Sequence, residues 1–220
     1  KELIGKSNRT EDDKLTPYVE ESDLFNLLDS LESTYKELFL ATALISLFGL
    51  RLSELAVLTV QDGNLYVGHI KKNANTSSRK RESRRAFAID LVEKPNLGAK
   101  VVRLYESGLI KLPKPVLTQI EKVREKNTYG DVGQAYVQIL ERNEVWKKIV
   151  KNNPDVTPYS LRHRFAHQCH KGSTVPLSVK DAAAAMGHTP STHMNFYARY
   201  TTELSVAKAF ERYIENRIEV

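Results

Sequence analysis

The chain has 220 residues, with 33 lysines and arginines against 27 aspartates and glutamates, which gives a formal net charge of +6. This length suits one domain with its own core, and the positive balance favours a polyanionic partner. No apolar run approaches the roughly 20 residues that a membrane-spanning helix needs, and the single Cys169 cannot form an intrachain disulfide, which is typical of a reducing compartment such as the cytoplasm.

The first part of the chain predicts helices. Residues 1–14 are polar and aperiodic, which is typical of a flexible arm. Ser22 can cap a first helix, and a second helix is expected from about Thr34 to Gly49, a natural stop. Ser53 can cap a third helix. The apolar residues that recur at helical spacing in the first two are Leu24, Leu27, Leu28, Leu31, Leu38, Ala41, Ile45 and Phe48.

Arg51 lies on the bend between two apolar helices, flanked by Leu50 and Leu52. Such an arginine is either held by an acid such as Glu54 or pointed into a cleft that takes an anion. Judged from this position alone, the structural salt bridge is the favoured reading.

Two strands are expected over residues 65–70 and 85–91, where apolar residues partly alternate. They enclose a basic run, because residues 71–85 hold seven basic residues against one acid, Glu82. The pattern predicts a β-hairpin with a long positive tip. A solvated loop or linker is an equal alternative for an isolated basic run. Since no amphipathic apolar face accompanies the charge, a nucleic acid suits it better than a membrane.

The middle of the chain mixes weak and strong signals. Residues 93–113 are poorly patterned and predict a loop, whereas Pro115 opens a helix. One long helix is expected after the turn at residues 129–131; it runs through Trp146 and ends before Pro154.

The last part of the chain predicts several short helices. Thr157 starts one of them, and Arg162 lies at the edge of its apolar stripe, where a positive group can reach a cleft while its stem packs. A second ends at Gly187, a third carries Tyr197, and a last one begins near Thr202. The stripe of the first of these helices is Leu161, Phe165 and Cys169.

Three of these segments read GLRLSEL at 49–55, YSLRHRFAH at 159–167 and MGHTPSTHMNFY at 186–197. Together they resemble the signature boxes of the tyrosine recombinases, the phage integrase family, which read approximately G-L-R-x-S-E-L, H-x-L-R-H and L-G-H followed by a tyrosine. The resemblance covers roughly residues 15–200. It implies a mainly α-helical catalytic domain with a small antiparallel β-sheet, the fold of DNA breaking-rejoining enzymes.

The resemblance also implies a reaction, the site-specific cleavage and rejoining of DNA strands for integration or excision of a phage or other mobile element. Arg51 and Arg162 are expected to fork onto the non-bridging oxygens of the scissile phosphate. Tyr197, nine residues after His188, is expected to attack in line and give a 3′-phosphotyrosine. Tyr200 is the competing nucleophile. His188 is expected to donate a hydrogen bond to the phosphate.

The general acid that protonates the leaving 5′ oxygen is a hairpin lysine in the family, and Lys71 or Lys72 occupies the matching place; Lys71 is preferred. One position departs from the pattern, because Tyr159 stands where the family usually has histidine. A phenol is a poor base near neutral pH. Either the base is less important than supposed, or His163 or water replaces it, or activity is low. Glu54 is expected to orient Arg51, and His163 is favoured as a supporting hydrogen bonder over a catalytic group.

The resemblance further implies double-stranded DNA as the partner, a homo-tetramer on two recombination sites, and a bacterial or phage-encoded, nucleoid-associated protein. Residues 1–14 would link to a preceding core-binding domain, and residues 201–220 would pack on a neighbouring protomer or in cis. No cofactor or metal is expected, since the covalent bond stores the energy of the broken one. The alternatives are a type IB topoisomerase and a decayed recombinase that only binds DNA. The residues expected to contact DNA are Lys72, Arg79, Lys80, Arg81, Arg84 and Arg85.

Overall fold

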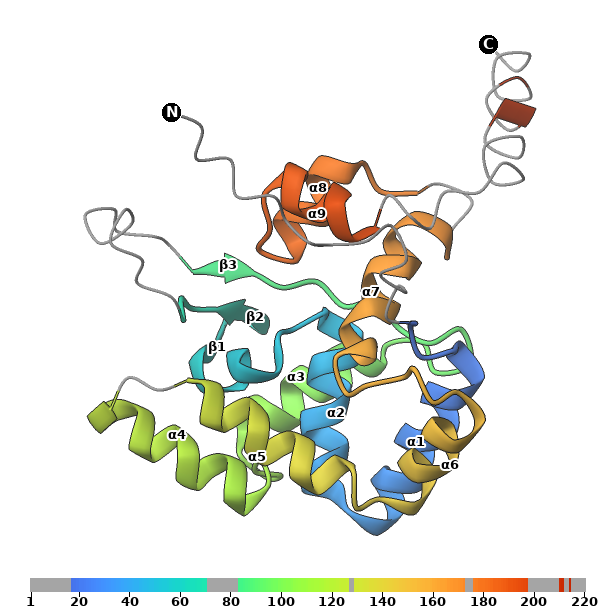
Figure 1. The fold of residues 1–220 in the computed structure, drawn as a ribbon. Helices are drawn as coiled ribbons and strands as arrows, with labels where there is room; N and C mark the ends of the chain where they lie inside the picture. The colour runs from blue at the N-terminus through green and yellow to red at the C-terminus, as the bar shows by residue number, and fades with distance from the viewer. Residues whose placement is uncertain are drawn as a thin grey trace, which may run out of the picture.

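This structure is a computed structural model that describes residues 17–70, 83–126, 129–172, 176–197, 210–211 and 214. Within these residues the chain is mainly helical with one small antiparallel sheet, which confirms the expected class (Figure 1). None of the described helices is long and apolar enough to cross a membrane. The expected arm and most of the expected last helix lie outside the described residues.

The elements follow one another in a simple order. In the first half they are α1 (Glu21–Thr34), α2 (Lys36–Phe48), the 3₁₀ helix η1 (Leu52–Val57), β1 (Leu58–Gln61), β2 (Asn64–Val67), β3 (Arg84–Arg85) and α3 (Leu97–Ser107). In the second half they are α4 (Lys114–Lys126), α5 (Gly130–Leu140), α6 (Glu144–Asn152), α7 (Ser160–Lys171), α8 (Val179–Ala185) and α9 (Pro190–Tyr197).

Helix α2 is buried along almost its whole length and forms the centre of the main core. Helix α1 packs on it through its four predicted leucines, although α1 is capped at Glu20 and the expected cap, Ser22, lies inside its first turn. Helix α2 ends as predicted at Gly49, whose φ of 60° is the left-handed conformation that suits glycine. A Cβ at Gly49 would lie 2.5 Å from Cδ1 of Phe165, so α7 packs directly on this turn.

The prediction of a helix capped by Ser53 is wrong, because a short 3₁₀ helix and strand β1 occupy that stretch. The cause lies at Arg51 and Glu54. The N–H of Arg51 donates to the Glu54 carboxylate over 2.7 Å, and the N–H of Glu54 donates to the Arg51 carbonyl over 2.8 Å. This reciprocal pair closes a tight turn, and the β-branched residues after it favour a strand.

The small sheet has the order β1-β2-β3, and both strand pairs are antiparallel. Asp62 and Gly63 join β1 to β2 with φ of 50° and 70°, the backbone that a two-residue hairpin turn requires. Strand β2 pairs with β3, with Val67 opposite Arg84, so the expected pairing of these two segments is present. The strands are shorter than expected, since residues 68–70 and 86–90 lie outside any strand and the N–H of Ile89 donates to Leu47 of α2 instead. The basic tip of the expected hairpin, at residues 71–82, lies outside the described residues.

Two predictions in the middle of the chain are wrong. Residues 93–113 are not a loop, because they contain α3, whose short apolar face is interrupted by Gly98. A Cβ at Gly98 would lie 2.2 Å from that of Ala88, so glycine permits a close approach there. The expected long helix through Trp146 is two helices, because the side chain of Asn143 accepts the first N–H groups of α6 and starts a new helix.

The predicted apolar stripe of α7 is buried, and the helix ends at the predicted Gly172. Phe165 and Cys169 of this stripe form a second, smaller core with Ala182 and Met186. Helices α8 and α9 lie together above β3 and α7 in Figure 1, so this small core holds them to the rest of the molecule.

Candidate functional site

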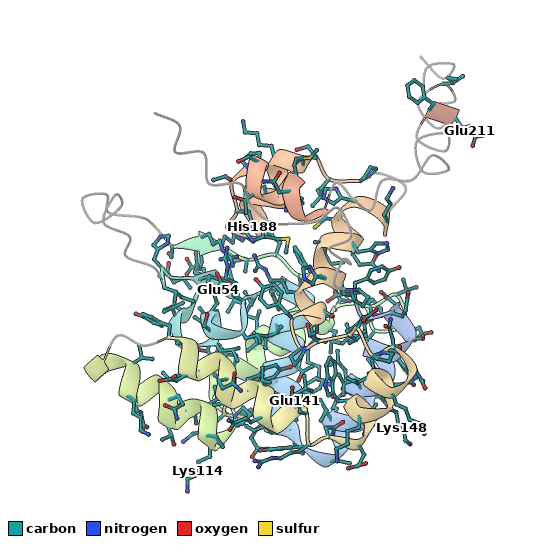
Figure 2. All side chains as sticks on the ribbon, viewed as in Figure 1. Glu54, Lys114, Glu141, Lys148, His188 and Glu211 are labelled. Atoms are coloured by element: carbon teal, nitrogen blue, oxygen red, sulfur yellow. The ribbon has the colours of Figure 1, made fainter. Side chains whose placement is uncertain are left out.

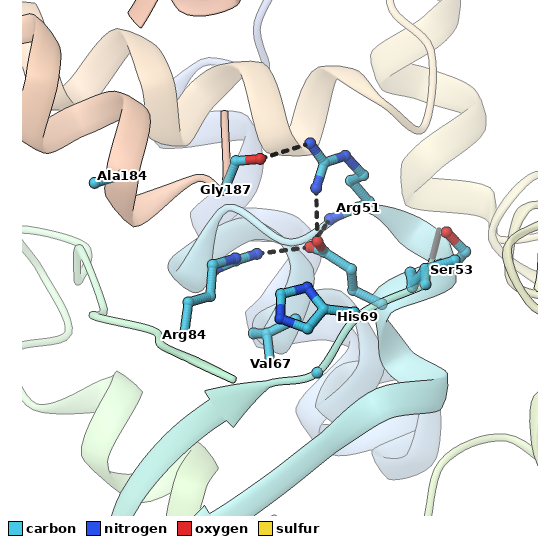
Figure 3. A pocket seen from close by; sticks show the side chains of 10 residues that line it. Arg51, Ser53, Val67, His69, Arg84, Ala184 and Gly187 are labelled. Atoms are coloured by element: carbon cyan, nitrogen blue, oxygen red, sulfur yellow. Dashed lines mark hydrogen bonds and ion pairs between the residues drawn. The ribbon is translucent and has the colours of Figure 1, made fainter. Parts of the chain in front are cut away.

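Three arginines from separate parts of the chain meet at one carboxylate, that of Glu54. Arg51 Nη1 lies 2.7 Å from Oε1, and Arg84 Nη2 lies 2.8 Å from Oε2. Arg162 Nη1 lies 3.6 Å from the same Oε2. In Figure 3, Arg51 and Arg84 approach from opposite sides. Folding therefore brings together the bend after α2, strand β3 and helix α7.

Glu54 is the acid at the centre of this cluster, and its side chain is 4% exposed. Burial alone would raise its pKa, but the charges of Arg84, Arg162 and Arg51 outweigh burial and hold the pKa below its ordinary value. Glu54 is therefore ionised at neutral pH. Among the described residues, one negative charge stands against three positive ones, so the cluster carries a surplus of positive charge and attracts an anion.

The turn that ends α8 is bonded by the same three arginines. The N–H groups of Gly187 and His188 donate to the carbonyls of Ala184 and Ala183, over 3.0 and 2.8 Å, which is the Schellman pattern that closes a helix at a left-handed glycine. Each of the next three carbonyls along the chain accepts from one guanidinium group. The pairs are Arg84 Nη1 with Ala185 O at 2.8 Å, Arg162 Nη2 with Met186 O at 2.7 Å, and Arg51 Nη2 with Gly187 O at 3.1 Å.

Arg162 is fully buried and also contacts the imidazole that follows this turn. Its Nη2 lies 2.8 Å from Nε2 of His188, and its Nη1 donates to the carbonyl of Gly49. A guanidinium group only donates hydrogen bonds, so His188 Nε2 accepts and its proton sits on Nδ1. Burial, followed by the charges of Arg162 and Arg51, lowers the pKa of His188 to about 3. His188 is therefore neutral at pH 7. Arg162 contacts both His188 and Glu54, the two residues of the site that Figure 2 labels.

A pocket of about 440 Å³ opens beside the cluster. Arg51 and Arg84 line it together, whereas Arg162 lies behind them. The pocket is large enough for a phosphate group and its neighbours. Its polar lining comes from the 3₁₀ helix, the end of the hairpin and the α8 turn, and consists of Arg51, Ser53, Glu54, His69, Arg84 and Gly187.

The residues of the second box lie at the start of α7. Tyr159 directly precedes the helix, is partly exposed, and meets His163 edge to face with ring centroids 5.3 Å apart. Burial, followed by the charge of Arg162, lowers the pKa of His163 to about 4. His163 is thus neutral at pH 7 but a weak proton acceptor, which counts against it as the replacement base.

Several predicted site residues lie outside the described part of the chain. These are Lys71, Lys72, Arg79, Lys80, Arg81 and Tyr200, and the side chain of Tyr197 belongs with them. The backbone of Tyr197 is described and is the last residue of α9.

The role of Arg84 is the feature that the sequence interpretation missed. Arg84 and Arg85 were both assigned to DNA contact, but they lie on opposite faces of β3. Arg84 turns toward Glu54, whereas Arg85 is exposed, donates to Asn64 Oδ1 and lies over the ring of Phe87 at 4.9 Å. The alternation of a strand carried this signal, because Arg84 shares its face with the buried Ala86.

Two further histidines near the site, His170 and His193, contact each other. His170 Nε2 lies 2.8 Å from His193 Nε2, which joins the end of α7 to α9. Among the described residues, no group of three or more His, Cys, Asp or Glu could hold a metal ion.

Comparison with known proteins does not assign this site to a family. No protein-family model, no curated protein and no solved structure gives a significant match to the chain. The chemistry of the site therefore rests on its own atoms: guanidinium groups in surplus, one ionised acid, a neutral imidazole and an adjoining pocket.

Proposed function

We propose that this protein is a tyrosine recombinase that cleaves and rejoins DNA strands at specific sites through a 3′-phosphotyrosine intermediate, for integration or excision of a phage or other mobile element. One observation carries the proposal. Arg51 and Arg162, which belong to different boxes, contact the same carboxylate and bond consecutive carbonyls of one turn. Two guanidinium groups held this close can grip one phosphate.

The surplus charge of the cluster supports a phosphodiester as the substrate. A phosphodiester resists attack, because its negative charge repels nucleophiles and its alkoxide leaves poorly. Guanidinium groups held in a buried site favour the charge that builds up on the non-bridging oxygens in the transition state. In the free protein, uncharged carbonyls of Met186 and Gly187 occupy these donors. Phosphate oxygens would replace them and form stronger, charge-assisted hydrogen bonds.

The remaining roles follow from the chemistry of each group. The Tyr197 hydroxyl gives its proton to water as it attacks phosphorus. The bond from phosphorus to the 5′ oxygen breaks, and Lys71 gives that oxygen its proton. His188 donates a hydrogen bond to the phosphate from its neutral ring. The 5′ hydroxyl of a second strand then reverses the step and releases the tyrosine. Because the phosphotyrosine bond conserves the energy of the phosphodiester, the cycle needs no nucleotide cofactor.

The test uses DNA that traps the covalent intermediate. A library of duplexes with a nick beside a randomised segment loses the short strand after cleavage, so religation fails and the adduct survives denaturation. We expect wild-type protein to form an adduct, Tyr197→Phe to form none, and Tyr200→Phe to react as the wild type does. Sequencing the trapped DNA gives the target site.

Two results would contradict the proposal in different ways. An undiminished adduct in Tyr197→Phe would assign the wrong nucleophile, and no adduct with wild-type protein would remove the reaction class. Relaxation of supercoiled plasmid without exchange between two copies of the trapped site would favour a topoisomerase instead.

A further inference from the structure

Arg84 is bonded as Arg51 is, through one carbonyl of the α8 turn and one oxygen of Glu54. Its hydrogen bond to the turn is shorter, 2.8 Å against 3.1 Å, and its side chain is less exposed than the 35% of Arg51. Arg84 Nη1 donates to Ala185 O and Nη2 to Glu54 Oε2, both at 2.8 Å, and the side chain is 17% exposed. Both terminal nitrogens are thus engaged by protein atoms at good distances. Arg84 joins the end of α8 to Glu54, the acid that Arg51 and Arg162 also contact.

The turn held by Arg84 leads directly into His188. The carbonyls at a helix C-terminus lack helical partners and carry a partial negative charge, which a cation stabilises. Here the Schellman pattern covers two carbonyls, and the arginines cover the next three. If phosphate draws Arg51 and Arg162 away from Gly187 and Met186, only Arg84 remains to hold the turn.

Arg84 also packs closely against the backbone of Gly187. A Cβ placed on Gly187 would lie 2.7 Å from Nε of Arg84 and 3.6 Å from Nη1 of Arg51. The side chain of Arg84 therefore lies, at Nε and Cδ, directly against the one residue of the turn that has no side chain. The next residue of the strand, Arg85, makes none of these contacts and instead reaches Asn64 and Phe87.

We propose that Arg84 is a positioning residue for strand cleavage, an inference that rests on the proposed function. It fixes the α8 turn on Glu54 while Arg51 and Arg162 exchange their carbonyl partners for phosphate oxygens. His188 then stays aimed at the phosphate, and α9, which ends at Tyr197, keeps its starting point.

The experiment separates positioning from DNA contact. Arg84→Lys keeps the positive charge but cannot bridge a carbonyl and a carboxylate as a planar fork does. We expect the single-turnover rate of adduct formation at saturating DNA to fall about 10- to 100-fold, because small misplacement of catalytic groups has effects of this size. The dissociation constant for DNA should not change. Arg103→Ala, which removes an exposed charge from α3, is the control and should keep the wild-type rate.

A second readout follows the turn without any reaction. We expect the pKa of His188, measured by NMR titration, to rise from about 3 in Arg84→Lys because the turn is released. A loss of charge cannot cause this rise, since lysine keeps the charge. Arg85→Lys should leave the His188 titration unchanged. Thermal unfolding of each variant shows that it is folded under the conditions used.

Each outcome decides something. A wild-type rate in Arg84→Lys overturns the inference. So does a weaker affinity for DNA with an unchanged saturated rate and a salt slope reduced by about 1, which is the signature of a phosphate contact. Absence of any adduct with wild-type protein would instead be a failure of the proposed function, and the His188 titration would still decide whether Arg84 holds the turn.

Discussion

Two arginines on α7, Arg162 and Arg164, are almost equally buried, at 0% and 1% exposure, yet their surroundings differ. Arg164 donates to the carbonyls of Ile89 and Asp90 and pairs with Glu21 at 2.8 Å. That arrangement sets one acid against one arginine. Arg162 shares the acid that it contacts, Glu54, with two further arginines.

The comparison teaches that burial does not mark a functional arginine, whereas charge balance does. In a buried pair of one acid and one arginine the two charges neutralise each other, so the pair has a structural role and attracts no further ion. A buried cluster with surplus positive charge is incomplete, because mutual repulsion of its guanidinium groups is relieved only when an anion arrives. We therefore interpret Arg164 as structural and the cluster around Glu54 as a site for phosphate.

The largest difference between the two arginines is expected when each of them is replaced by alanine. Arg162→Ala should lower the rate of adduct formation about 1,000-fold, the size seen when one preorganised donor to a transition state is removed. The free energy of unfolding of this variant should fall by less than the activation free energy rises, because Glu54 keeps Arg51 and Arg84 as partners. Single-turnover trapping and urea unfolding measure the two effects.

Arg164→Ala is the matched control on the same helix. It should keep the chemical step and lose about 2 kcal/mol of unfolding free energy, a moderate cost because its partner Glu21 is 31% exposed and can be solvated. If both variants lost rate and stability in the same proportion, the distinction between the two regions would be wrong.

The next effect concerns the acids. Glu54→Gln removes the single negative charge from three guanidinium groups and should lower the free energy of unfolding by about 3 kcal/mol at pH 7, as expected when one partner of a buried ion pair is lost. Glu21→Gln, at the balanced and more exposed pair, should cost less. Equal costs in urea unfolding would contradict the assignment.

The pH dependence of the same variant has a definite sign. The folded-state pKa of Glu54 lies below its ordinary value, so its stabilisation is complete above the unfolded pKa of about 4.3 and is lost as the pH falls through the lower folded pKa. Wild-type protein should therefore lose stability on acidification over this window. In Glu54→Gln that part of the loss should be missing, and unfolding curves measured at several acidic pH values would show it.

The smallest expected effect is direct binding of an anion. Inorganic phosphate at about five times its dissociation constant should stabilise the wild-type protein by about 1 kcal/mol. Arg164→Ala should respond in the same way, because its pair takes no anion. Arg51→Ala should respond less, since Arg51 lines the pocket and its removal leaves the main core intact. An equal rise in melting temperature for Arg51→Ala would place the anion elsewhere.

The resemblance to the recombinase boxes picked out Arg51 and Arg162, and each also stands at a helix boundary or stripe edge where an apolar pattern is interrupted. Sequence reasoning also anticipated the glycine that ends α2 and the one that follows α8, since positive φ leaves few other residues possible. Helical periodicity gave α1, α2 and α7. These features depend on neighbours within a few residues, which the sequence displays directly.

The rest depends on contacts between distant segments. The 3₁₀ turn after Arg51 is fixed by hydrogen bonds with Glu54 that compete with a regular helix, and α3 was missed because its apolar face is short. Arg84 was grouped with the basic run, since only the pairing of β3 with β2 shows which face it occupies. Periodicity cannot reveal that three donors share one turn.

The close contact between Gly187 and Arg84 couples two distant positions of the chain. A side chain at 187 would meet Arg84 and would also have to adopt a φ of 65°. A residue other than glycine is therefore expected there only where position 84 holds a smaller side chain. Relatives of this protein are therefore expected to vary at these two positions together, and a combinatorial library that randomises both should recover compensating pairs rather than independent choices.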